Sequence, residues 1–179
     1  MLKTIALAVL GMTAAFAAYV AVQPSAFRVV RTGKIDAPPA QVFAQVNDLH
    51  KWQAWSPWAK LDPKATNSFE GPEAGKGAAM SWAGNRDVGE GKMTIVESNP
   101  NDSITFRIDF AKPMQATNTT LFTFKPDGDG TIVTWDMSGN NTFTSRVVCT
   151  FMNMDKMVGG MFETGLGNLN KVVGQPAKT

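Results

Sequence analysis

The chain has 179 residues, with 17 basic and 15 acidic side chains and a formal net charge of +2. Such a balance, without runs of Lys or Arg, provides no electrostatic surface for nucleic acid. A single cysteine, Cys149, and a single histidine, His50, exclude an intramolecular disulfide, a cysteine zinc site and a histidine-rich metal site. No cofactor is predicted, and the length fits one globular domain with or without an added segment.

The first segment is uncharged and mostly apolar over residues 4–22, and Lys3 precedes it. At about 1.5 Å per residue in a helix, it approaches the thickness of a bilayer core. Two interpretations stay open: an uncleaved membrane anchor, or a signal peptide cut after Ala15-Phe16-Ala17. We therefore assign residues 1–23 to an anchor or signal peptide and 24–179 to a domain. Lys3 favours a domain outside the cytoplasm in either case, either membrane-anchored or released to the periplasm or medium.

Residues 27–35 alternate as a strand does, and Asp36 with the two prolines that follow predicts a helix start. Residues 39–47 carry apolar side chains at helical spacing and predict a short amphipathic helix. A second helical piece is expected over 49–55. It ends before Pro57, because a residue that precedes proline is disfavoured in helical geometry.

From about residue 66 the apolar pattern has a period of two, which indicates an antiparallel meander. Strands are expected at 77–82, 91–98, 103–110, 115–125 and 131–139, with turns at 84–87 and 127–130. Residues 144–173 then predict one long amphipathic helix, in which Gly159-Gly160 implies a bend or a close approach by another group. Strands followed by one long helix predict an α+β domain of two layers.

Three stretches carry a family resemblance: APPAQVFAQVNDLHKWQAWSPW at 37–58, GKMTIVES at 91–98 and FMNMDKMVGGMFETGLGNL at 151–169. They resemble the START-like superfamily and, more narrowly, the bacterial polyketide cyclase/dehydrase and lipid-transport (SRPBCC) proteins, over about residues 27–172. The resemblance implies the helix-grip fold, in which about seven antiparallel strands wrap a long C-terminal helix and two short helices close one end. It also implies an apolar cavity between sheet and helix.

Candidate cavity residues follow from that fold and from the alternation of the strands. Among three closely spaced tryptophans, Trp55 is expected to contact a ligand, while Trp52 and Trp58 pack the short helices onto the sheet. Asn118 and Thr120 are polar side chains on the apolar face, and they either orient a ligand or hydrogen-bond each other. The full set is Trp55, Trp82, Met93, Phe106, Phe110, Asn118, Thr120, Phe122, Trp135, Met154, Met157 and Met161. A completely packed core is the alternative.

Three functions remain open on this basis. The first is a binding module for an apolar small molecule or lipid, associated with a membrane through residues 4–22. The second, a cyclase or dehydratase, needs an inward acid/base pair, and the inward-facing positions between 103 and 137 hold no Asp, Glu, His or Lys. The third is an envelope scaffold with a filled cavity. Asp155 and His50 are expected at the surface, Asp155 in an ion pair or a cap contact.

Overall fold

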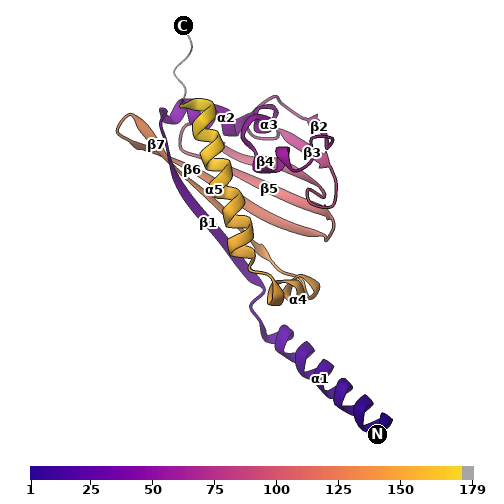
Figure 1. Cartoon of the computed structure of the whole chain (residues 1–179). Coiled ribbons are helices and arrows are strands. Elements are labelled where there is room, and N and C mark those ends of the chain that lie inside the picture. Colours follow the sequence, from indigo (N-terminus) through magenta and orange to yellow (C-terminus); the bar gives the residue numbers. More distant parts are fainter. Residues whose placement is uncertain (175–179) are drawn as a thin grey trace.

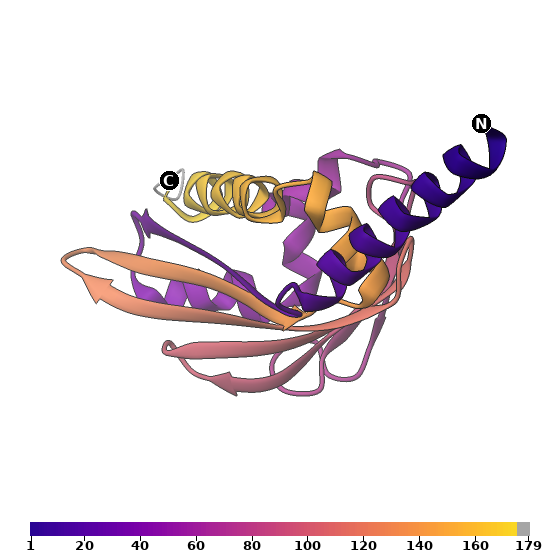
Figure 2. The same ribbon diagram turned by 90° about the horizontal axis from the view of Figure 1, so that it is seen from below.

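Seven strands form one antiparallel sheet in the computed structural model, which describes residues 1–174. Their order across the sheet is β1-β7-β6-β5-β4-β3-β2, so the chain runs as a meander from β2 to β7 and then pairs β7 with β1. The sheet curves around helix α5 (Met154–Val173), which lies on its concave side (Figure 1; Figure 2). The strands are β1 (Ala26–Ile35), β2 (Thr66–Glu70), β3 (Ala79–Ala83), β4 (Glu90–Asn99), β5 (Ser103–Lys112), β6 (Ala116–Asp127) and β7 (Gly130–Asn140). The predicted α+β helix-grip architecture is confirmed.

The concave face of the sheet is apolar because successive strand residues point to opposite faces. In β7 the alternate residues Val133, Trp135 and Met137 are buried, as the period of two predicts. The same alternation buries Phe122 and Phe124 of β6. These side chains form the core together with residues of α5 and of the short helices.

The short helices lie at one end of the sheet. They are α2 (Pro39–Asn47), the 3-10 helix η1 (Leu49–Lys51), α3 (Trp52–Trp55) and a second 3-10 helix, η2 (Pro57–Lys60). Asp36 is not the cap of α2 as predicted, since it stands two residues before the N-cap residue, Pro38. Its carboxylate instead accepts a hydrogen bond from the side-chain amide of Asn170 on α5, at 3.1 Å.

The C-terminal segment forms two helices, α4 (Phe143–Phe151) and α5, so the prediction of one uninterrupted helix over 144–173 was wrong. Met152 and Asn153 leave helical geometry between them. The Asn153 side chain accepts a hydrogen bond from the Lys156 backbone N–H at 2.9 Å and thereby caps α5. Such a cap stabilises a new helix start, and no proline or glycine is present there to announce the break.

Helix α5 continues through Gly159-Gly160, and the predicted close approach is made by Arg31 of β1. A methyl group on Gly159 would overlap the Arg31 guanidinium. The same guanidinium donates to the carboxylates of Asp155 at 3.0 Å and Glu163 at 2.7 Å. Asp155 therefore makes its surface ion pair with β1, and the pair fastens the sheet edge to the helix.

Helix α1 (Leu2–Val22) extends away from the sheet domain (Figure 1). Among the residues described, it is the one helix long and apolar enough to cross a membrane by length and composition. The predicted boundary at 23/24 falls between α1 and β1. The last five residues of the predicted domain, 175–179, lie outside the described part of the chain.

Candidate functional site

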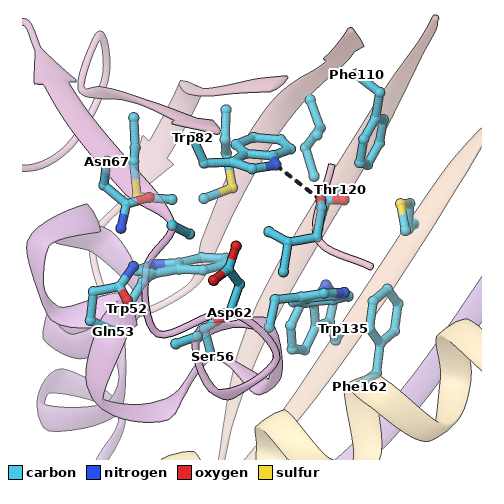
Figure 3. Close-up of a pocket in the computed structure, with 18 residues that line it drawn as sticks. Trp52, Gln53, Ser56, Asp62, Asn67, Trp82, Phe110, Thr120, Trp135 and Phe162 are labelled. Atoms are coloured by element: carbon cyan, nitrogen blue, oxygen red, sulfur yellow. Dashed lines mark hydrogen bonds between the residues drawn. The ribbon is translucent and has the colours of Figure 1, made fainter. Parts of the chain in front are cut away.

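A cavity of about 130 Å³ lies between the concave face of the sheet and the segment that runs from α3 to β2. Figure 3 shows aromatic side chains lining it, contributed by the short helices, by β3, β5 and β7, and by α5. The sulfur-containing and aromatic residues in the lining are Trp52, Trp58, Met80, Trp82, Met93, Phe110, Trp135, Met137 and Phe162. Apolar walls with a few polar groups are typical of sites for small molecules.

One polar group of the lining is buried without a partner. The Thr120 hydroxyl, on β6, is enclosed and has no hydrogen-bond partner within the described residues. Asn118, two residues earlier on the same face, does not bond to it; its amide donates instead to the Met137 sulfur at 3.6 Å. Because a buried hydroxyl without a partner costs about 1–3 kcal/mol, Thr120 is the natural group to receive a polar atom of a ligand.

The tryptophans occupy positions other than those expected. Trp52 and Trp58 line the cavity, whereas Trp55 is fully buried behind it, near Phe122 and Trp135 at ring distances of 6.3 and 5.8 Å. Residues three apart on a helix differ by only about 60° in direction. A small rotation of α3 therefore decides which ring meets the cavity, and the sequence does not encode that rotation.

The other candidate residues fall into two groups. Trp82, Met93, Phe110, Thr120 and Trp135 come together in the cavity lining. Within the described structure, seven lie elsewhere: Trp55, Phe106, Asn118 and Phe122 are buried in the core, and Met154, Met157 and Met161 lie on α5.

Met157 was expected to face the sheet but is 47% exposed. The reason is helix geometry: Met157 and Phe162 are five residues apart on α5 and therefore point about 140° apart. Phe162 lies on the buried face of α5 and lines the cavity, so Met157 points away from it. Phe162 was not predicted, although its place on the same apolar stripe as Val158 and Leu169 was a usable signal. Its ring stacks on Trp135 at 4.2 Å.

Asp62 is the carboxylate of the cavity lining and was not predicted. It follows η2, outside any strand, so the alternation used to select inward residues did not reach it. Its two oxygens accept hydrogen bonds from the backbone N–H groups of Asn85 at 2.6 Å and Lys64 at 3.0 Å. The bond from Asn85 holds the segment after η2 against the turn that joins β3 to β4, and the bond from Lys64 is local to that segment.

The carboxyl groups with a clearly shifted pKa lie outside the cavity. The Thr117 hydroxyl, which donates to Asp109, lowers the pKa of Asp109 on β5. The Arg31 guanidinium lowers the pKa of Asp155 in the same way. His50 lies 3.1 Å from Asp48 and its ring stacks on Phe69, near the outer surface. Among the described residues, no group of three metal-ligating side chains is gathered together.

A curved antiparallel sheet that wraps a long C-terminal helix, with an apolar cavity between them, defines the START-like helix-grip class. The family comparison agrees: residues 26–174 match the family described as polyketide cyclase/dehydrase and lipid transport. The protein belongs to this family.

Solved structures share the fold at low sequence identity. Protein CV1439 from Chromobacterium violaceum is 16% identical, with 86% of this chain and 100% of that chain covered and a TM-score of 0.60. Mll3558 from Rhizobium loti is 16% identical over 82% of this chain and 99% of that chain, with a TM-score of 0.58. CalU16 from Micromonospora echinospora is 17% identical over 86% of this chain and 78% of that chain, with a TM-score of 0.55. A search of curated proteins gave no match. These likenesses concern the fold, and the fold alone does not name a function.

Proposed function

We propose that the protein is a binding module that holds a small apolar molecule, or the apolar end of a lipid, in the cavity beside Trp52 and Thr120. The observation that carries the proposal is the unpartnered Thr120 hydroxyl in an otherwise apolar enclosure. A ligand with one polar atom would satisfy this hydroxyl, while its apolar part would replace empty space against the aromatic walls.

The volume limits the ligand. An engineered apolar cavity of about 150 Å³ takes up benzene, whereas sites for drug-sized molecules span about 300–1,000 Å³. The 130 Å³ present here suits one aromatic ring or the end of an acyl chain. A volume of this size also argues against a scaffold whose core is filled.

Helix α1 supports a second part of the proposal, that the module is held at a membrane. A helix of 21 residues is about 30 Å long, which matches the hydrocarbon core. With Lys3 on the cytoplasmic side, the domain would lie outside the cytoplasm. If α1 is instead removed as a signal peptide, the same domain would be released there.

Asp62 is the observation that favours the alternative, a cyclase or dehydratase. A carboxylate at the cavity could act as a general base. It is, however, the one titratable side chain among the cavity-lining residues described, so no acid/base pair is formed there. Binding without chemistry is therefore the simpler function for this cavity.

The test is a comparison of phenol with toluene, which differ by one hydroxyl group, on the full chain in detergent. The indoles that line the cavity report binding through their fluorescence. In Thr120→Val we expect the affinity for phenol to fall roughly three- to tenfold while that for toluene is kept, since one hydrogen bond is lost. Thr119→Val is the matched control, because Thr119 is exposed on the opposite face of β6.

Two outcomes would overturn the proposal: no saturable fluorescence change with either compound, or equal losses for both in Thr120→Val. The enzyme alternative is separated by Asp62→Asn. If the parent protein converts a bound compound, and Asp62→Asn still binds that compound but no longer converts it, chemistry at the cavity would be established.

A further inference from the structure

Helix α4 carries its side chains in the reverse of the usual order. A surface helix normally turns its apolar stripe toward the core and its polar side outward. In α4 the small polar Ser145 is only 8% exposed, whereas Phe143 is 46% and Phe151 is 76% exposed. Phe143, Val147 and Phe151 lie four residues apart and share one face of the helix. The face that α4 presents outward is thus the apolar one.

Helix α4 is also fastened to the end of α1. The Arg146 guanidinium donates to the backbone oxygens of Ala21 at 2.9 Å and Gln23 at 3.0 Å, where α1 ends. The rings of Phe151 and Phe16 lie 5.9 Å apart. Figure 1 shows α4 beside the junction where α1 leaves the domain. A membrane surface at the C-terminal end of α1 would therefore also contact α4.

The contact with Phe16 places the apolar face at a definite depth along α1. Phe16 lies about 9 Å along the helix axis from Val22, at 1.5 Å per residue. Amphipathic helices that lie on membranes bury their apolar face by about 5–10 Å at the boundary between headgroups and acyl chains. If Val22 lies near the bilayer surface, Phe151 reaches this boundary, and Arg146 stays near the headgroups.

We infer that α4 is an interfacial helix, which lies in the membrane surface with Phe143 and Phe151 inserted among the lipids. Met152, between α4 and α5, and Met157, in the first turn of α5, are also exposed and extend the apolar surface. The inference rests on the proposed membrane insertion of α1 and adds a second attachment to it. Two attachments fix the tilt of the domain, so that its α4 end lies on the membrane and the turn between β6 and β7, at the other end of the sheet, points away (Figure 1).

The experiment uses the full chain in phosphatidylcholine nanodiscs. Cys149→Ser removes the single cysteine, and one new cysteine is then labelled with an environment-sensitive dye at Thr144, Gly11 or Asp129. Thr144→Cys places the dye beside Phe151 on the exposed face of α4 and leaves both aromatic rings intact. Gly11→Cys reports on α1, and Asp129→Cys on the β6–β7 turn. Lipids brominated near the headgroup quench dyes at the interface, lipids brominated near the end of the acyl chain quench dyes at the bilayer centre, where position 11 is expected, and aqueous iodide quenches dyes in water.

We expect the dye at 144 to be quenched roughly twofold by the lipids brominated near the headgroup and protected from iodide, as for a group at the lipid boundary. The dye at 129 should behave oppositely. Adding Phe143→Ser and Phe151→Ser should make the dye at 144 accessible to quenching by iodide. Phe69→Ser, at an exposed ring away from α4, should leave the quenching of this dye unchanged.

The arms separate the two hypotheses. Lipid quenching at 11 without lipid quenching at 144 overturns the interfacial helix and leaves the tether standing. Loss of lipid quenching at both positions overturns the tether and with it this inference. Protection of 144 from both quenchers, with cysteine cross-links between chains, would show that a second copy covers α4 and would also overturn it.

Discussion

Trp52 and Trp55 are packed against each other with ring centroids 4.5 Å apart, yet their indole N–H groups differ. The N–H of Trp52 donates to the Val46 backbone oxygen at 2.9 Å. The N–H of Trp55 is buried and has no partner within the described residues 1–174. Two neighbouring tryptophans of equal size therefore contribute differently to stability.

This difference predicts the result of replacing each indole by a phenyl ring. Trp52→Phe leaves the Val46 oxygen unpaired, whereas Trp55→Phe removes a donor that had no partner. We expect Trp52→Phe to cost about 1–3 kcal/mol more of unfolding free energy than Trp55→Phe. Urea unfolding of the full chain in detergent measures both, and equal costs would contradict the prediction.

A second prediction at this scale concerns pH. The Arg31 hydrogen bonds lower the pKa of Asp155, so the folded state favours the carboxylate. The resulting stability is present above the unfolded-state pKa of about 3.9 and is lost as the pH falls through the lower folded value. Arg31→Met should raise the pKa of Asp155 toward its ordinary value. The difference in melting temperature between this variant and the parent should be smaller in acid than at neutral pH.

NMR titration of the Asp155 carboxyl group measures the pKa directly. Arg107→Met is the control, because Arg107 pairs with Asp109 on β5 and not with Asp155. An unchanged Asp155 pKa in Arg31→Met would show that the ion pair between Arg31 and Asp155 is not formed in solution.

At the scale of elements, the attachment of β1 to α5 depends on one glycine. Gly159 leaves room for the Arg31 side chain, while its neighbour Gly160 has open space where a methyl group would go. Alanine stabilises a helix interior relative to glycine by about 0.5–1 kcal/mol when nothing obstructs it. The two adjacent glycines thus form a natural pair for measurement.

We expect Gly160→Ala to stabilise the protein by about 0.5–1 kcal/mol. Gly159→Ala should be less stable than Gly160→Ala, because the new methyl group displaces the Arg31 guanidinium from Asp155 and Glu163. In an Arg31→Ala background the two alanine variants should become equal, as a double-mutant cycle would show. Equal stabilities already in the parent background would mean that Arg31 moves aside at no cost.

At the scale of the whole molecule, the cavity links ligand and stability. A ligand that binds only the folded state stabilises it by about 2.7 kcal/mol at a hundred times its Kd. We therefore expect phenol to raise the melting temperature of the full chain. Ala59→Phe, which directs a ring into the cavity, should abolish this rise without lowering the melting temperature in the absence of phenol.

Ala54→Phe is the control for that variant, since Ala54 is exposed on the neighbouring helix and outside the cavity lining. The rise with phenol should persist in it. Persistence of the rise in Ala59→Phe as well would place the phenol site elsewhere in the molecule.

Much of the fold was predictable because strand and helix periods are local. Alternation over a few neighbouring residues determined which side chains of β5, β6 and β7 face inward, and two prolines predicted the start of α2. The uncharged run at 4–22 predicted α1 by the same kind of local count. The close approach at Gly159 was also predictable, because glycine in a helix needs a reason.

Only the tertiary structure decided which residues meet. The break at Asn153, the choice of Trp52 and Trp58 over Trp55 at the cavity, and the entry of Asp62 and Phe162 into its lining all depend on how distant segments pack. So does the outward apolar face of α4, which its sequence alone would have assigned to the core. A local pattern sets the period of an element, but its rotation and direction follow from contacts with residues far along the chain.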